Sequence, residues 1–74
     1  DYRLVNEWTV EKNVVLPLMI AGYPEDVQKA QAQRLLKHVK LAEYTHKYPL
    51  ELSGGEQQRV GVARALSKNP VIIL

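Results

Sequence analysis

The sequence predicts a mainly α-helical piece of a larger α/β domain. Three stretches carry the apolar spacing and the start and stop signals of helices. The last four residues, 71–74, are instead an unbroken run of β-branched residues and leucine, which is typical of a strand buried on both faces. A buried strand needs neighbouring strands, and the sequence contains no second convincing one. We therefore expect the rest of the sheet to lie outside these 74 residues.

The first predicted helix spans residues 10–21, after a loop over residues 1–8. Thr9 can cap its amino end. Pro17 cannot donate a hydrogen bond to the carbonyl four residues earlier, so we expect a kink there. Gly22 can end the helix in the left-handed conformation. The apolar residues at intervals of four are Val10, Val14 and Leu18.

The second predicted helix begins at Pro24 and runs to about residue 39, with two acidic residues in its first turn. A short helical turn over residues 42–47 follows, and Pro49 stops it. The solvated face of the second helix is predicted to contain Gln28, Lys29, Gln33 and Lys37. Its uneven apolar stripe contains Val27, Ala30, Leu35 and Val39.

The third predicted helix has the clearest start. Ser53 and Glu56 have the spacing of a capping box, in which each side chain accepts from the backbone amide of the other residue. The run Lys-Asn-Pro at residues 68–70 closes the helix. Its predicted apolar face consists of Val60, Ala63 and Leu66, together with Val62.

The start of this third helix can bind an anion. Gly54 and Gly55 follow the Ser53 cap, and they leave the first amides of the helix uncovered by any Cβ atom. The Ser53 hydroxyl adds one more donor. A plain helix start is the alternative, because serine caps are common. Two consecutive glycines cost about 1 kcal/mol each relative to alanine, however, which makes a purely structural role less attractive.

Composition and charge exclude several classes of function. The net charge of +2 is small and the charges are interspersed, so no nucleic-acid partner is expected. The longest strongly apolar run, residues 14–21, is too short to cross a bilayer. The chain has no cysteine, which excludes disulfides and thiolate metal sites. His38 and His46 have no paired ligand nearby, so we expect no metal site.

Residues 52–60 read Leu-Ser-Gly-Gly-Glu-Gln-Gln-Arg-Val, and residues 63–66 read Ala-Arg-Ala-Leu. These two runs resemble the signature motif and signature helix of the ATP-binding-cassette (ABC) ATPases, which are α/β P-loop NTPases. One departure is Gly61, where the family usually has alanine. Residues 9–18 look like the first helix of the family's helical subdomain, just after its Q-loop. Residues 69–74 are similar to the strand that leads to the Walker B aspartate.

The resemblance implies an incomplete ABC domain. Residues 1–50 would form the helical subdomain. Residues 51–74 would supply the signature motif, its helix and the start of the Walker B strand. Within the family, the closest resemblance is to ATPases of the lipoprotein-releasing, macrolide-exporter and FtsE-like branch.

The resemblance also implies a mechanism that needs two ATPase subunits, paired head to tail around two ATP molecules. Ser53, Gly54 and Gly55 would donate to the γ-phosphate of ATP held by the opposing subunit, with Glu56 and Gln57 at the edge of the nucleotide. Walker A, the Mg²⁺ ligands and the catalytic glutamate would lie outside these residues. We therefore expect no catalytic residue in this stretch and no ATP hydrolysis by it alone. The full-length protein would be an ATP hydrolase that powers membrane transport.

The family's transport members contact a transmembrane permease just after the Q-loop. This places the protein at the cytoplasmic face of the cell (inner) membrane, as a peripheral subunit. An alternative is that Leu4 and Trp8 only cover the helical core. The candidate permease-facing residues are Tyr2, Arg3, Leu4, Val5 and Trp8.

Two other functions remain open. ABC ATPases of translation and DNA repair carry similar signatures without transporting anything, although the compact spacing here favours a transporter. A non-enzymatic helical interaction module is the second alternative. It predicts a self-contained fold and no sheet partner for residues 71–74.

Overall fold

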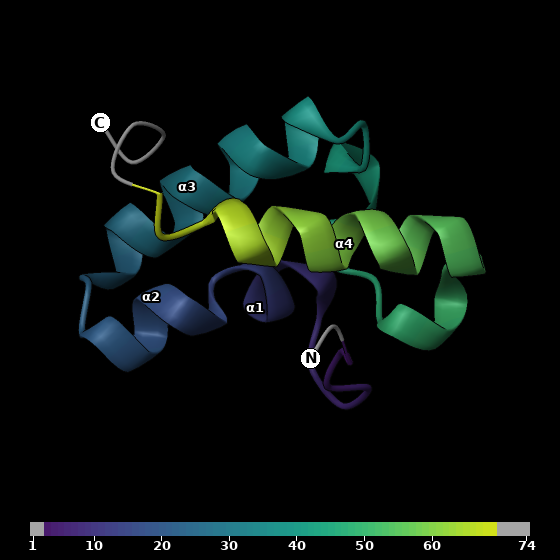
Figure 1. Cartoon of the computed structure of the whole chain (residues 1–74), viewed down its shortest axis with the longest axis horizontal. Coiled ribbons are helices and arrows are strands. Elements are labelled where there is room, and N and C mark those ends of the chain that lie inside the picture. Colours follow the sequence, from purple (N-terminus) through teal and green to yellow (C-terminus); the bar gives the residue numbers. More distant parts are fainter. Residues whose placement is uncertain (1–2, 70–74) are drawn as a thin grey trace.

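The computed structural model describes residues 3–69 (Figure 1). Within this range the chain forms four α-helices and two short 3-10 helices, and no strand. The long helix α4, Gly54–Leu66, lies across the others, with α3 on one side and α1 and α2 on the other (Figure 1). The mainly helical prediction is thus confirmed for the described residues. The strand predicted at residues 71–74 lies outside them.

The predicted first helix is in fact two helices, α1 (Val10–Val14) and α2 (Leu16–Ala21). Val15 separates them, with φ −91° and ψ 5°. The expected kink is therefore a full break. Pro17 lies in the first turn of α2, where its missing N–H leaves no helical bond unmade. Gly22 ends α2 with φ 82°, as predicted.

Asn13 joins the N-terminal loop to α1 from inside the core, where its side chain is fully buried. Its Oδ1 accepts from the amide of Val5 at 2.7 Å. Its Nδ2 lies 3.0 to 3.2 Å from the carbonyl oxygens of Val5, Trp8 and Thr9. One side chain therefore satisfies backbone groups at three positions of the loop, and it fixes the path of the loop into the helix.

The buried face of α3 (Glu25–His38) differs from the predicted stripe. Leu35 is buried as predicted, but Ala30 is exposed and Gln28 is half-buried. The difference arises because Gln31 points inward, where its Nε2 donates to the carbonyl of Ser67 at 3.1 Å. That hydrogen bond ties α3 to the end of α4. The buried residues of α3 are Gln31, Ala32, Leu35 and Leu36.

Helix α3 ends in a Schellman motif that places a lysine in the left-handed conformation. Lys40 has a φ of 64°. Its amide donates to the carbonyl of Lys37 at 3.1 Å, and the amide of Leu41 donates to the carbonyl of Leu36 at 2.7 Å. Leu36 and Leu41 are both fully buried, which completes the hydrophobic contact of the motif.

The segment between α3 and α4 contains two 3-10 helices, η1 (Ala42–Tyr44) and η2 (Pro49–Glu51). The first lies inside the predicted turn, and the second was not predicted. Between them, the carbonyls of Thr45 and Lys47 accept from the first two amides of α1, at 3.1 and 2.8 Å. The amino end of α1 is thus capped by the segment that leads into α4.

Helix α4 begins as predicted and buries Val60, Gly61 and Ala63. Val62 was predicted to share this face, but its side chain is 44% exposed. The reason is geometric, because residues that are two positions apart in an α-helix point to nearly opposite sides, and Val62 is two positions after the buried Val60. Gly61 is buried, although the sequence predicted only apolar side chains on this face. The core consists of Val10, Val14, Val15, Leu18, Ala32, Leu35, Leu36, Leu41, Leu52, Val60 and Ala63.

His38 and His46 are exposed, and no cluster of metal-ligating side chains occurs within residues 3–69. None of the described helices has the length and apolar character needed to cross a bilayer.

Replacing Asn13 by alanine should destabilise the chain by roughly 2–3 kcal/mol, because buried backbone groups of the loop would lose their partners. Urea unfolding followed by far-UV circular dichroism measures this loss. Asn6→Ala is the matched control, since Asn6 is exposed in the same loop. Equal unfolding midpoints for the two variants would contradict the role given to Asn13.

Replacing Lys40 by glycine should stabilise the chain by about 1 kcal/mol, because glycine adopts a positive φ without the strain of a Cβ atom. The same replacement at Lys37, an exposed residue inside α3, should destabilise by a similar amount. Thermal unfolding of both variants tests the pair. A loss of stability in Lys40→Gly would show that the left-handed backbone is not strained there.

Candidate phosphate-binding site

The amino end of α4 is held by a reciprocal capping box. Ser53 is the N-cap, with the extended backbone angles φ −67° and ψ 165°. Its Oγ accepts from the amide of Glu56 at 3.2 Å, and its own amide donates to Oε1 of Glu56 at 2.8 Å. The predicted box is confirmed. It uses the backbone amides of Ser53 and Glu56, as the sequence predicted.

Within residues 3–69, two backbone donors remain without an acceptor at this helix end. The amides of Gly54 and Gly55 have no acceptor among the described residues, whereas the amide of Gln57 donates to the carbonyl of Ser53 at 2.9 Å. The Ser53 hydroxyl accepts from the amide of Glu56 and also interacts with the Glu56 carboxylate, so its hydrogen is shared with a group of the protein. Ser53, Gly54 and Gly55 are all exposed. The helix therefore presents two free amides and the edge of the Ser53 hydroxyl to solvent at the positive end of its dipole.

The fold itself does not require glycine at either position. A Cβ atom built on Gly54 or Gly55 would meet no atom within 4 Å. Neither residue has a positive φ. Alanine would fit at both positions and would favour the helix. The constraint that remains is the approach of an outside group to the backbone amides.

The carboxylate of Glu56 is turned back toward the helix cap. The hydrogen bond from the Ser53 amide lowers the pKa of Glu56, helped by the Ser53 hydroxyl, the Tyr44 hydroxyl and the charge of Arg59. The negative charge of Glu56 in turn raises the pKa of Tyr44, which donates a hydrogen bond to it. Glu56 is therefore ionised at neutral pH, and its charge is directed at donors of the protein itself.

Gln57 has partners inside the chain. Its Nε2 donates to the carbonyl of Pro49 at 2.7 Å and lies 3.3 Å from the carbonyl of Leu52. Both acceptors belong to the segment immediately before Ser53. The sequence carried no sign of these contacts, because η2 was not predicted.

The structure brings part of the predicted permease-facing segment close to this helix end. Arg3 and Leu4 line a pocket of about 730 Å³ together with Gly54 and Gln57. Arg3 is exposed, whereas Leu4 is half-buried against the core.

The other described candidates of the permease-facing segment are less exposed than Arg3. Val5 and Trp8 are half-buried, and the ammonium group of Lys12 lies 4.4 Å from the centre of the Trp8 ring. Tyr2 lies outside the described residues.

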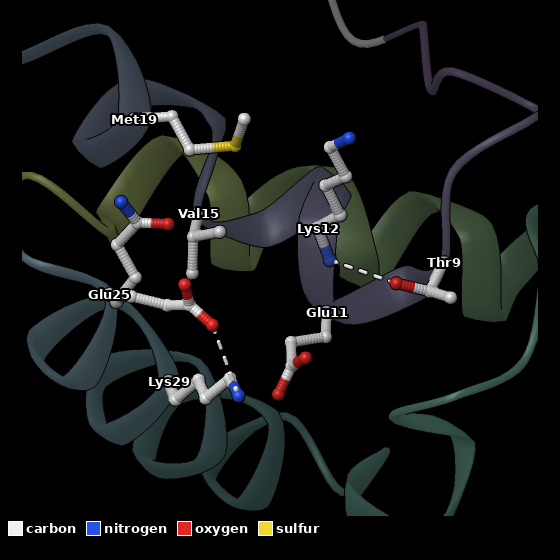
Figure 2. A pocket seen from close by; sticks show the side chains of 8 residues that line it. Thr9, Glu11, Lys12, Val15, Met19, Glu25 and Lys29 are labelled. Atoms are coloured by element: carbon white, nitrogen blue, oxygen red, sulfur yellow. Dashed lines mark hydrogen bonds and ion pairs between the residues drawn. The ribbon is translucent and has the colours of Figure 1, made fainter.

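A second pocket, of about 500 Å³, lies between α1, α2 and α3 (Figure 2). At one side the Thr9 hydroxyl caps α1 by accepting from the amide of Lys12 at 3.2 Å. At the other side Lys29 and Glu25 form an exposed ion pair at 3.3 Å. Charges of both signs alternate around Val15 and Met19, and none of the lining residues belongs to the start of α4. This arrangement does not indicate a particular ligand.

Comparison with known proteins agrees with the resemblance read from the signature motif. Similar proteins include the methionine import ATP-binding protein MetN of Caulobacter vibrioides, 47% identical over 73 residues, which are 99% of this chain and 22% of that protein. MetN 2 of Enterococcus faecalis is 48% identical over 99% of this chain and 21% of that protein. MetN of Bifidobacterium longum is 44% identical over the whole chain and 18% of that protein.

The chain thus spans about a fifth of the length of the curated relatives it matches. Their names give no support to the lipoprotein-releasing, macrolide-exporter and FtsE-like branch expected from the sequence. The family model described as "ABC transporter" matches residues 1–74, which is the entire chain. The chain therefore belongs to the ABC transporter family of ATP-binding proteins.

Proposed function

We propose that this chain supplies the signature motif of an ATPase subunit that powers membrane transport. The Ser53 hydroxyl and the amides of Gly54 and Gly55 would bind the γ-phosphate of ATP held by a second ATPase subunit. The carrying observation is that both glycine amides are free while the space above both residues is open. A helix end of this kind stabilises negative charge as it develops on a transferring phosphoryl group.

The rest of the ATP molecule would be bound elsewhere. The sequence has no glycine followed by lysine, so it has no Walker A motif to hold the other phosphates. No group of residues within 3–69 could hold Mg²⁺ through several carboxylates. The family resemblance would place that ATP and its Mg²⁺ on the opposing subunit of a head-to-tail dimer.

The same proposal divides the chain by function. Residues 1–50 act as the helical subdomain. Residues 51–74 carry the signature motif, the helix that orients it and the start of the Walker B strand. The break between α1 and α2 and the packing of α3 on α4 serve to place the signature helix.

The transport assignment extends to an importer. All three relatives described above are named as methionine import proteins, which favours uptake of methionine or a similar amino acid over the exporter branch expected from the sequence. A transmembrane permease would bind this subunit at the cytoplasmic face of the membrane. Arg3, which is exposed, is the strongest permease-facing candidate of the described residues. Leu4 and Trp8 are half-buried, so part of each side chain packs on this chain and the rest would contact the permease. Val5 and Tyr2 complete the proposed contact.

Gly55→Ala in the full-length protein should lower ATP turnover roughly tenfold or more, because the new methyl group would stand where the phosphate approaches. The same substitution should raise stability by about 0.5–1 kcal/mol through helix propensity. Ala65→Gly is the control, because it exchanges the same two residue types at an exposed position of the same helix and so changes helix stability without changing the site. Wild-type turnover in Gly55→Ala would overturn the proposal.

Glu56→Gln should make stability less sensitive to acid. A glutamine oxygen can still accept from the Ser53 amide, so the cap persists while the charge is lost. The lowered pKa of Glu56 means that its carboxylate stabilises the fold above its ordinary pKa of about 4.3, and that this contribution disappears as the pH falls through the lowered value.

Thermal unfolding midpoints measured from neutral pH to below pH 4 test this expectation. Wild type should be the more stable at neutral pH, and the difference should shrink below about pH 4.3. Glu7→Gln, at an exposed position in the N-terminal loop, controls for the loss of one negative charge. A difference that stays constant with pH would contradict the role of the carboxylate.

A further inference from the structure

We propose that Gln57 is a positioning residue that fixes the phosphate donors of the signature turn before any nucleotide arrives. Resemblance alone had placed Gln57 at the edge of the nucleotide, and the structure points to a different task. The inference rests on the proposed function of Ser53, Gly54 and Gly55, because it concerns the orientation of those donors.

The contacts of Gln57 span the turn from both sides. Its Nε2 donates to the carbonyl of Pro49 at 2.7 Å, a short bond for an amide donor, and lies 3.3 Å from the carbonyl of Leu52. Pro49 is fully buried and Leu52 nearly so. Gln57 therefore ties the second turn of α4 to two backbone positions that the core already holds in place.

The position of Ser53 follows from these ties. Ser53 comes directly after Leu52, and its carbonyl accepts from the amide of Gln57. Gln57 thus holds Ser53 in two ways. Its side chain holds Leu52, the residue before Ser53, and its backbone amide holds the carbonyl of Ser53 itself. The segment just before Ser53 is held as a turn by a hydrogen bond from the Tyr48 amide to Oε2 of Glu51, at 2.8 Å. The donors at Gly54 and Gly55 then have one orientation, which lowers the ordering cost when a phosphate binds.

The chemistry of the side chain excludes a phosphate contact by Gln57 while these bonds persist. A carboxamide has two N–H donors, and the Gln57 nitrogen directs them at backbone carbonyls. The atom left over is Oε1, an acceptor, which a phosphate oxygen repels. Gln57 therefore acts on phosphate only through the residues that it holds.

Gln57→Met in the full-length protein removes both donors at nearly constant length and charge. Gln58→Met is the matched control, because Gln58 is the next residue along and its side chain is exposed. Hydrogen exchange of the bonded backbone amides of the turn, those of Leu52, Ser53, Glu56 and Gln57, should speed up about fivefold to tenfold without nucleotide. ATP turnover should fall several-fold, while affinity for ADP, which has no γ-phosphate, should stay at the wild-type value.

A second variant guards against a folding defect. Gln57→Asn keeps the amide but withdraws it by one methylene, so it should reproduce both effects, and far-UV circular dichroism checks that both variants are folded. Unchanged exchange without nucleotide in both variants would overturn the proposal and favour direct contact with ATP. Faster exchange with wild-type turnover would also overturn it, because Gln57 would then matter only for the local structure.

These outcomes are separable from failure of the proposed function. If Gly55→Ala hydrolyses ATP at the wild-type rate, the γ-phosphate site itself is wrong. The exchange rates in nucleotide-free Gln57→Met would still report whether Gln57 holds the turn.

Discussion

The buried side chain of Asn13 is the interaction on which this arrangement of helices depends. Helix α1 has only five residues, too few to be stable alone, and it needs partners at both ends. Asn13 supplies one set by bonding to the N-terminal loop. Thr45 and Lys47 supply the other by accepting from the first amides of α1. The two sets of bonds place α1 between the beginning of the described chain and the segment that leads to α4.

A continuous series of contacts connects α1 to the candidate site. The segment that caps α1 continues into η2, whose Pro49 is buried and accepts from Gln57. Gln57 belongs to α4, the helix whose first residues carry the free amides. The exposed donors of Gly54 and Gly55 are thus supported by hydrogen bonds to Pro49 and Leu52, two buried residues. Such support matters because a donor that is already oriented loses little entropy when it binds an anion.

The sequence predicted the features that depend on neighbours within one helical turn. The box between Ser53 and Glu56 and the left-handed end at Gly22 are of this kind, and both are confirmed. It did not predict features decided by distant partners. Gln31 resembles a surface residue until the carbonyl of Ser67 is placed beside it, and the contacts of Gln57 depend on a 3-10 turn at Pro49. The misplaced Val62 is a different kind of error, because helix geometry alone places residue 62 nearly opposite Val60.

The openness of the phosphate-binding turn has a physical consequence for how it can act. In solvent, water competes for the amides of Gly54 and Gly55 and screens the dipole of α4, so this helix end by itself holds phosphate weakly. Its attraction grows when a second surface covers the turn and excludes water. The same two glycines that weaken the start of α4 allow such a surface to come close, because no Cβ atom stands in the way. A site built in this way would bind strongly only when it is closed, as the proposed contact with a nucleotide held by another subunit requires.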